Sequence, residues 1–138
     1  MKGDHIYYRD GYKYVLSQDY TVQTVIKHYS IDTVFISLTP DGVLTIRKDY
    51  AWDGASGPTV DTKTSMRGSL VHDALYQLER EGLVSINDRK DADKMLRDIC
   101  IEDGMMEWRA RLWYLSVRLF GGTAADSNIE YPSLTAPE

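Results

Sequence analysis

Cysteine, net basic charge and long apolar runs are all scarce in this chain, and each scarcity excludes a class of protein. Cys100 is the only cysteine among 138 residues, so the sequence allows no disulfide within the chain and no zinc site built from cysteines. The net charge is −5, which disfavours binding of nucleic acid through a basic face. No apolar run approaches the length of a membrane span, and the first residues lack the apolar core of a signal peptide. We therefore expect a soluble protein that is synthesised in the cytoplasm, without a transmembrane segment and without a nucleic-acid partner.

The length and the composition fit a single globular domain. Hydrophobic residues make up 43% of the chain and charged residues 27%, a balance that is typical of folded domains. We predict one domain over residues 1–122, because residues 123–138 contain two prolines and show no hydrophobic periodicity. We expect these last residues to form a flexible tail or an arm that becomes ordered on a partner.

The first half of the chain predicts antiparallel strands. Short runs rich in β-branched and aromatic residues occupy residues 11–16, 21–28, 33–38 and 43–48. Turn residues separate these runs, and Pro40-Asp41-Gly42 is the strongest hairpin turn, since proline presets one turn angle and glycine tolerates positive φ. The pattern therefore predicts an antiparallel sheet of three to five strands.

The second half predicts three helices packed on this sheet, which makes the fold class α+β. The first spans about residues 63–81 and stops at Gly82, the second begins near residues 85–88 and stops at Gly104, and the third spans about 105–120. The third helix carries two apolar stripes, namely Trp108, Leu112, Leu115 and Leu119, and Trp113, Tyr114, Val117 and Phe120. We therefore expect it to be covered on more than one side, by the sheet, the other helices or a partner subunit.

The most informative segment is the loop at residues 49–62, rich in Gly, Asp, Ser and Pro, together with the helix after it. Loops of this length inside a compact domain are often functional. His72 and Tyr76 lie one turn apart on the first helix and share a face, while Asp73 points farther from the apolar stripe. An antiparallel second helix would bring Asp93 within hydrogen-bond reach of His72. The sequence thus predicts an imidazole oriented by one carboxylate, with a second carboxylate beside it.

This arrangement suits metal-assisted hydrolysis. Asp93 on one ring nitrogen of His72 would leave the other nitrogen as a general base. Asp73 is a candidate ligand for Ca²⁺, whose shell the backbone carbonyls of the loop at Trp52, Gly54 and Ser56 would complete. The cation would polarise a carbonyl or phosphoryl group while His72 activates water. The same residues have a structural interpretation, because a His–carboxylate pair between helices also satisfies buried polar groups.

Four motifs resemble a family found in bacteriophages, prophages and bacteria, the family of unknown function DUF1353. They read Asp53-Gly54-Ala55-Ser56-Gly57-Pro58, His72-Asp73-Ala74-Leu75-Tyr76, Arg89-Lys90-Asp91-Ala92-Asp93 and Val117-Arg118-Leu119-Phe120-Gly121. The resemblance covers residues 40–122, in order, with the departure that Thr59 follows Pro58 where a basic residue is expected. It implies a phage or prophage product made in the bacterial cytoplasm and associated with the virion. The partners it suggests are other phage proteins or a second copy, bound through the third helix or the tail.

A second resemblance, to phospholipase A2-like enzymes, is more local. Those enzymes pair a Gly-rich calcium loop with a His-Asp-x-x-Tyr helix and with an Asp on the next, antiparallel helix. The resemblance implies that His72 is the base, Asp73 the calcium ligand and Asp93 the residue that orients His72, with Tyr76 supporting Asp93. This chain departs from them in having a single cysteine and fewer glycines in its loop.

Three functions remain open on the sequence. The first is a small calcium-dependent hydrolase acting on a lipid, peptidoglycan or another ester or amide. The second is a non-enzymatic tail or neck protein of a virion, in which the His72 network only holds helices together. The third is a protein that binds and blocks a bacterial target. The exposure of His72 separates the first two, since a base needs access to its substrate.

Overall fold

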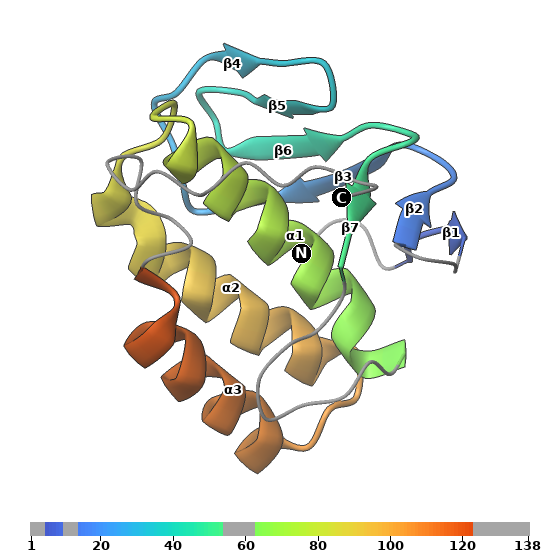
Figure 1. Cartoon of the computed structure of the whole chain (residues 1–138), viewed down its shortest axis with the longest axis vertical. Helices are drawn as coiled ribbons and strands as arrows, with labels where there is room; N and C mark the ends of the chain where they lie inside the picture. The colour runs from blue at the N-terminus through green and yellow to red at the C-terminus, as the bar shows by residue number, and fades with distance from the viewer. Residues whose placement is uncertain (1–4, 10–13, 54–62, 123–138) are drawn as a thin grey trace, which may run out of the picture.

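The computed structural model describes residues 5–9, 14–53 and 63–122 (Figure 1). Within these residues, antiparallel strands come first and three α-helices follow, so the predicted α+β class is confirmed. The helices lie in succession away from the strands, and α3 is the farthest from them in Figure 1. No helix of this part of the chain is long and apolar enough to cross a membrane. The predicted tail at residues 123–138 lies outside the described residues.

The described strands form two small antiparallel sheets rather than the single sheet that the sequence predicts. The larger has the order β3 (Tyr20–Gln23), β6 (Val43–Ile46), β5 (Ile36–Leu38) and β4 (Ile31–Asp32). The smaller has the order β1 (Tyr8–Arg9), β2 (Tyr14–Leu16) and β7 (Ala51–Trp52). The predicted turn at residues 40–42 joins β5 to β6. Gly42 has φ of 88° there, and a Cβ atom on it would lie 2.7 Å from the carbonyl oxygen of Thr24.

Two local turns explain why the strands differ from the prediction. The strand predicted over residues 21–28 is shorter in the structure, where β3 ends at Gln23. The hydroxyl of the next residue, Thr24, accepts a hydrogen bond from the backbone N–H of Ile26, and this bond turns the chain. Asp49 adopts φ of 77° just after β6, which redirects the chain into β7. The predicted loop over residues 49–62 therefore begins with a strand, and its residues 54–62 lie outside the described part.

The three helices are α1 (Lys63–Arg80), α2 (Arg89–Glu102) and α3 (Glu107–Phe120). The bounds of α1 and α3 lie within two residues of the predicted bounds. Gly82 and Gly104, with φ of 76° and 103°, end the first two helices as predicted. The predicted cap at Ser85 accepts a hydrogen bond from the backbone N–H of Asn87, so it caps a short 3₁₀ turn, η1 (Ile86–Asp88), that leads into α2.

The buried apolar residues form two clusters. The main one joins both sheets to α1 and α2, and includes Leu16, Val22, Leu44, Ile46, Leu70, Leu75, Ala92 and Ile99. The second lies between α2 and α3 and consists of Leu96, Cys100, Met105, Ala110 and Trp113. Burial raises the pKa of the Cys100 thiol to about 12, as expected of a packing residue. The sequence predicted that both apolar stripes of α3 are covered. In the structure the stripe that contains Trp108 is exposed, and in the other stripe Phe120 is exposed as well.

Candidate functional site

A glycine brings α1 close to α2 one turn before His72. A Cβ atom on Gly68 would lie 2.7 Å from Cys100 Sγ and 3.2 Å from the carbonyl oxygen of Leu96. The first distance is shorter than real Cβ contacts and the second is unusually tight, so the absence of a side chain allows the two helices to approach this closely. Gly68 and His72 lie one turn apart on the same side of α1. The close approach therefore places the His72 ring directly against α2.

We expect Gly68→Ala to lower the free energy of unfolding by about 1–3 kcal/mol, because the added methyl group overpacks this contact. The same substitution in a Cys100→Ala background should cost less, since its closest neighbour is then absent. A double-mutant cycle by urea denaturation measures the coupling, expected at about 0.5–2 kcal/mol. Strictly additive losses would show that Gly68 does not set the distance between the helices.

The hydrogen bond predicted between His72 and Asp93 is present. Nε2 of His72 lies 2.7 Å from Oδ1 of Asp93, and the hydroxyl of Tyr76 donates to the same oxygen at 2.5 Å. The rings of His72 and Tyr76 are in contact, with centroids 4.0 Å apart. The structure thus brings together the three residues predicted as catalytic, and it holds the imidazole from two sides.

Asp93 is the centre of a larger network that joins all three helices. Its side chain is completely buried, and Arg118 of α3 donates to its second oxygen at 2.8 Å. Although burial opposes ionisation, the hydrogen bonds from His72 and Tyr76 lower the pKa of Asp93 below its ordinary value. The Tyr76 pKa is raised by burial and by this carboxylate, so its hydroxyl remains a donor. Asp93 is therefore a buried, ionised acceptor.

Arg89 and Arg118 are site residues that sequence reasoning missed as such. Arg89 lies one turn before Asp93, with Nη1 3.6 Å from Asp93 Oδ2 and 3.2 Å from the Tyr76 hydroxyl. It also donates to the carbonyl oxygens of Val117 and Arg118 at the end of α3. Gly121 completes this junction, since a Cβ atom on it would lie 2.7 Å from the Tyr76 hydroxyl. The only signal in the sequence was that these residues belong to the motifs quoted above, and the structure shows that three of the motifs meet here.

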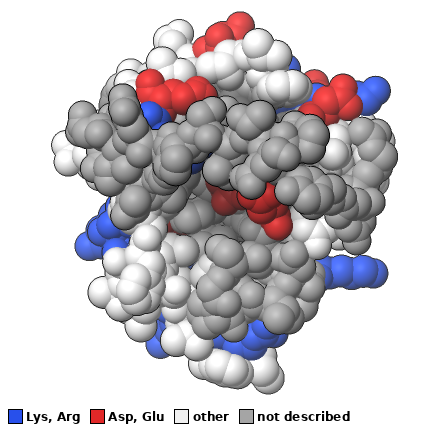
Figure 2. Space-filling model, in the orientation of Figure 1, with Lys and Arg blue, Asp and Glu red and all other residues white. Residues whose placement is uncertain are grey.

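Asp73 lies on the opposite side of His72, at a polar pocket. Its Oδ1 is 4.0 Å from Nδ1 of His72, and its side chain is 37% exposed. The pocket has a volume of about 330 Å³ and is lined by Tyr50, Trp52, Asp53, Asp73, Tyr76 and Arg80, among others. His72 is not among its lining residues in the part of the chain that the structure describes, and its side chain is 9% exposed. Figure 2 shows acidic side chains in a hollow near the middle of the viewed face.

The oxygen donors at this pocket have the chemistry of calcium ligands. Asp53 and Asp73 supply two carboxylates, and Trp52, predicted as a ligand through its carbonyl oxygen, is among the lining residues. The other two predicted ligands, Gly54 and Ser56, lie outside the described residues. Among the described residues, no cluster of three or more His, Cys, Asp or Glu side chains could hold a metal on its own. A cation here would therefore depend on backbone carbonyls or water for most of its shell.

Glu79 is a buried carboxyl group that sequence reasoning missed. It lies on α1 seven residues after His72, it is 2% exposed, and within the described residues neither of its carboxylate oxygens has a hydrogen-bond partner. Burial, and next the negative charge of Asp93, raise its pKa to about 8. Asp88, Arg89 and Arg118 are the other charged groups that act on it. Glu79 is therefore protonated at neutral pH in the folded protein.

This raised pKa makes stability depend on pH in a definite direction. Between the ordinary value of 4.5 and about 8, the folded protein keeps a proton that the unfolded chain releases, so stability falls as the pH rises. We expect Glu79→Gln to match the wild type at about pH 4 and to exceed it by about 2–4 kcal/mol at pH 8. Chemical denaturation at the two pH values measures this, and an equal difference at both would contradict the raised pKa.

The comparisons with known proteins agree with the motifs. The model of one protein family, described as protein of unknown function (DUF1353), matches residues 31–117, which is more than half of the chain. Neither a curated protein nor a solved structure matches the chain. The matched residues contain α1 and α2, and with them His72, Tyr76, Arg89 and Asp93, whereas Arg118 lies one residue beyond the match.

Proposed function

The chain belongs to this family of proteins of unknown function (DUF1353), so an activity has to be inferred from the site, and we propose a small calcium-assisted hydrolase that uses His72, Asp73 and Asp93. Its substrate is an ester or amide, of a lipid or of the cell wall. The observation that carries the proposal is that the two ring nitrogens of His72 face two different carboxylates. Asp93 is buried and would orient the imidazole, whereas Asp73 lines a pocket and would bind the cation.

The buried carboxylate determines which nitrogen acts as the base. Because Asp93 is ionised and accepts, Nε2 of His72 carries the proton in the neutral ring. Nδ1 is then the nitrogen with the free lone pair, and it lies on the side of Asp73. Tyr76 contacts the ring and bonds to Asp93, so the imidazole is held in one orientation.

The pocket side supplies the ligand role. Asp73 and Asp53 would hold the cation together with backbone carbonyls of the segment that begins at Trp52. A cation held there would supply a Lewis acid for the carbonyl or phosphoryl oxygen of the group whose carbon or phosphorus atom the water attacks. His72 takes the proton from the attacking water at Nδ1, and Asp93 stabilises the imidazolium that results.

A hydrolysis assay with and without calcium tests this proposal. The purified chain is incubated with p-nitrophenyl esters, phosphatidylglycerol vesicles and peptidoglycan, each in calcium and in excess chelator. We expect turnover of at least one of these substrates, slowed about 100-fold or more by the chelator. Turnover of none of them, or turnover that is unaffected by the chelator, contradicts the proposal.

A second candidate is a non-enzymatic virion protein of the tail or neck, made in the bacterial cytoplasm. The low exposure of His72 and its absence from the described residues that line the pocket favour it. In this candidate the four side chains around Asp93 only fix the packing of three helices. It predicts that mass spectrometry finds the chain in purified phage particles and that no substrate is turned over.

A further inference from the structure

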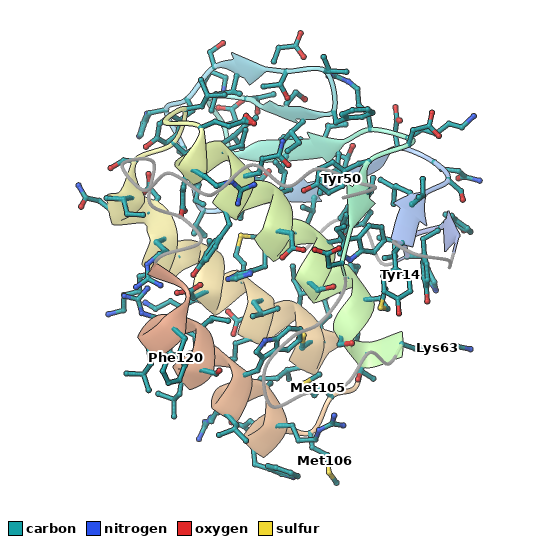
Figure 3. The ribbon with its side chains drawn as sticks, in the orientation of Figure 1. Tyr14, Tyr50, Lys63, Met105, Met106 and Phe120 are labelled. Carbon is teal, nitrogen blue, oxygen red and sulfur yellow. The ribbon has the colours of Figure 1, made fainter. Side chains whose placement is uncertain are left out.

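Helix α3 exposes an apolar row on the side opposite its own core. Trp108, Leu112, Leu115 and Leu119, which we call the outer seam, are 63%, 45%, 55% and 75% exposed. The side that faces α2 buries Ala110 and Trp113 instead. The two sides point in opposite directions, so packing on α2 cannot cover the outer seam. Met106 and Phe120, 65% and 78% exposed, project at the two ends of the same helix (Figure 3).

The spacing of the outer seam is that of a coiled-coil interface. Its residues follow one another at intervals of four, three and four, as d, a, d and a positions of a heptad do. The row is one residue wide, whereas helices that lie in a membrane surface bury a broader apolar face. On each side polar residues follow at once, including Arg111, whose side chain is 67% exposed. The shape therefore favours another helix over a lipid surface.

The charges beside the outer seam select the kind of helix. In the same heptad the flanking e and g positions are Arg109, Arg111, Ser116 and Arg118. Arg118 is bonded to Asp93, so Arg109 and Arg111 are the flanking arginines outside that network. Glu107, the one acidic residue of α3, lies at its first position and is bonded to Arg111. This local excess of positive charge contrasts with the net charge of −5 of the whole chain.

A second copy of the chain fits these charges poorly. Glu107 is the one acidic residue of α3 and is bonded to Arg111 of its own helix, so the α3 of a second copy brings no further carboxylate to Arg109 and Arg111. Aspartate or glutamate at the facing positions would instead form ion pairs with the arginines. The facing helix is therefore acidic where α3 is basic.

We propose that the outer seam binds an amphipathic helix of another protein, with an apolar seam of its own that is flanked by aspartate and glutamate. The inference does not depend on chemistry at His72, since none of the four seam residues contributes to the site. Whether the chain is a hydrolase or a virion protein, the inference specifies that its partner is an acidic amphipathic helix.

Binding of designed peptides to the full chain tests the proposal. Two labelled helical peptides of about 21 residues carry leucine at a and d, one with glutamate and the other with lysine at e and g. Fluorescence anisotropy should give an affinity for the glutamate peptide that is about tenfold or more higher, and that falls as salt is added. Leu115→Glu should weaken this binding about tenfold or more. Val34→Glu, at an apolar residue that is 80% exposed near the other end of the fold, should leave it unchanged.

Several results would overturn the proposal. These are binding of neither peptide, equal binding of both, or loss of binding in Val34→Glu as well. Sedimentation of the wild type as a dimer that Leu115→Glu dissociates would assign the seam to a second copy. Capture by phosphatidylglycerol vesicles that depends on Leu115, without peptide binding, would assign it to a membrane. Circular dichroism melts of both variants establish that the fold is retained, which the exposure of both residues leads us to expect.

Discussion

Asp93→Ala should lower the free energy of unfolding by about 3–5 kcal/mol, the largest loss that we expect of any single substitution at the site. The carboxylate is fully buried and accepts from His72, Tyr76 and Arg118, so its removal leaves these donors without their acceptor in a dry environment. Arg118 would be left as a partly buried charge without its ion pair. Urea denaturation followed by circular dichroism measures the loss.

Asp98→Ala is the matched control for this prediction. Asp98 lies on the same helix, but its side chain is 49% exposed and its ion pair is with the neighbouring Arg97. Exposed pairs of this kind contribute about 0–1 kcal/mol, so we expect little change. If the two alanine variants lost similar amounts, Asp93 would not be the residue that holds α1, α2 and α3 together.

His72→Gln should reduce kcat/KM about 10²- to 10⁴-fold while the fold stays intact. The glutamine amide can still donate a hydrogen bond to Asp93, but it provides no basic nitrogen on the side of Asp73. His72→Ala would remove the hydrogen bond and the ring contact with Tyr76 as well, so it mixes chemistry with stability. The glutamine variant therefore isolates the proposed role of the base, and initial rates on the substrate found by the calcium assay measure it.

The outcome of this substitution separates the two candidate functions. A glutamine variant with unchanged melting temperature and lost turnover supports a catalytic His72. A variant that retains full turnover would show that the imidazole is not the base. Asp98→Asn, a carboxylate-to-amide change on α2 at an exposed position, should leave the rate within about twofold of the wild type.

The helical period explains how much of the site could be predicted. A period of 3.6 residues places His72 and Tyr76 on one face of α1, and an antiparallel neighbour then brings Asp93 to them. Glu79 lies on the same face by the same period, so the sequence contained the signal for it. What the period cannot provide is the distance between helices, which depends on Gly68.

The remaining features depend on contacts between segments that are distant in the sequence. Arg118 reaches Asp93 only because α3 ends against α1, where Gly121 leaves room for the Tyr76 hydroxyl. Likewise, the division of the strands into two sheets follows from the turn at Asp49, which adopts a backbone conformation that is uncommon for a residue with a side chain. Neither the contact of Arg118 with Asp93 nor the turn at Asp49 has a signature in local periodicity. For this reason the sequence predicted a single sheet and gave Arg89 and Arg118 no role in the site.

Calcium binding is the property on which the proposed function depends most directly, and isothermal calorimetry on the wild type, Asp73→Asn and Asp98→Asn measures it. The account predicts that the wild type and Asp98→Asn bind calcium alike, and that Asp73→Asn loses the binding while its thermal melt is retained. Asp73 borders the pocket and Asp98 does not, so the two amide variants differ only in the proposed ligand. A wild type that releases no heat with calcium, or an Asp73→Asn variant that binds it equally well, would contradict a calcium-assisted site at His72.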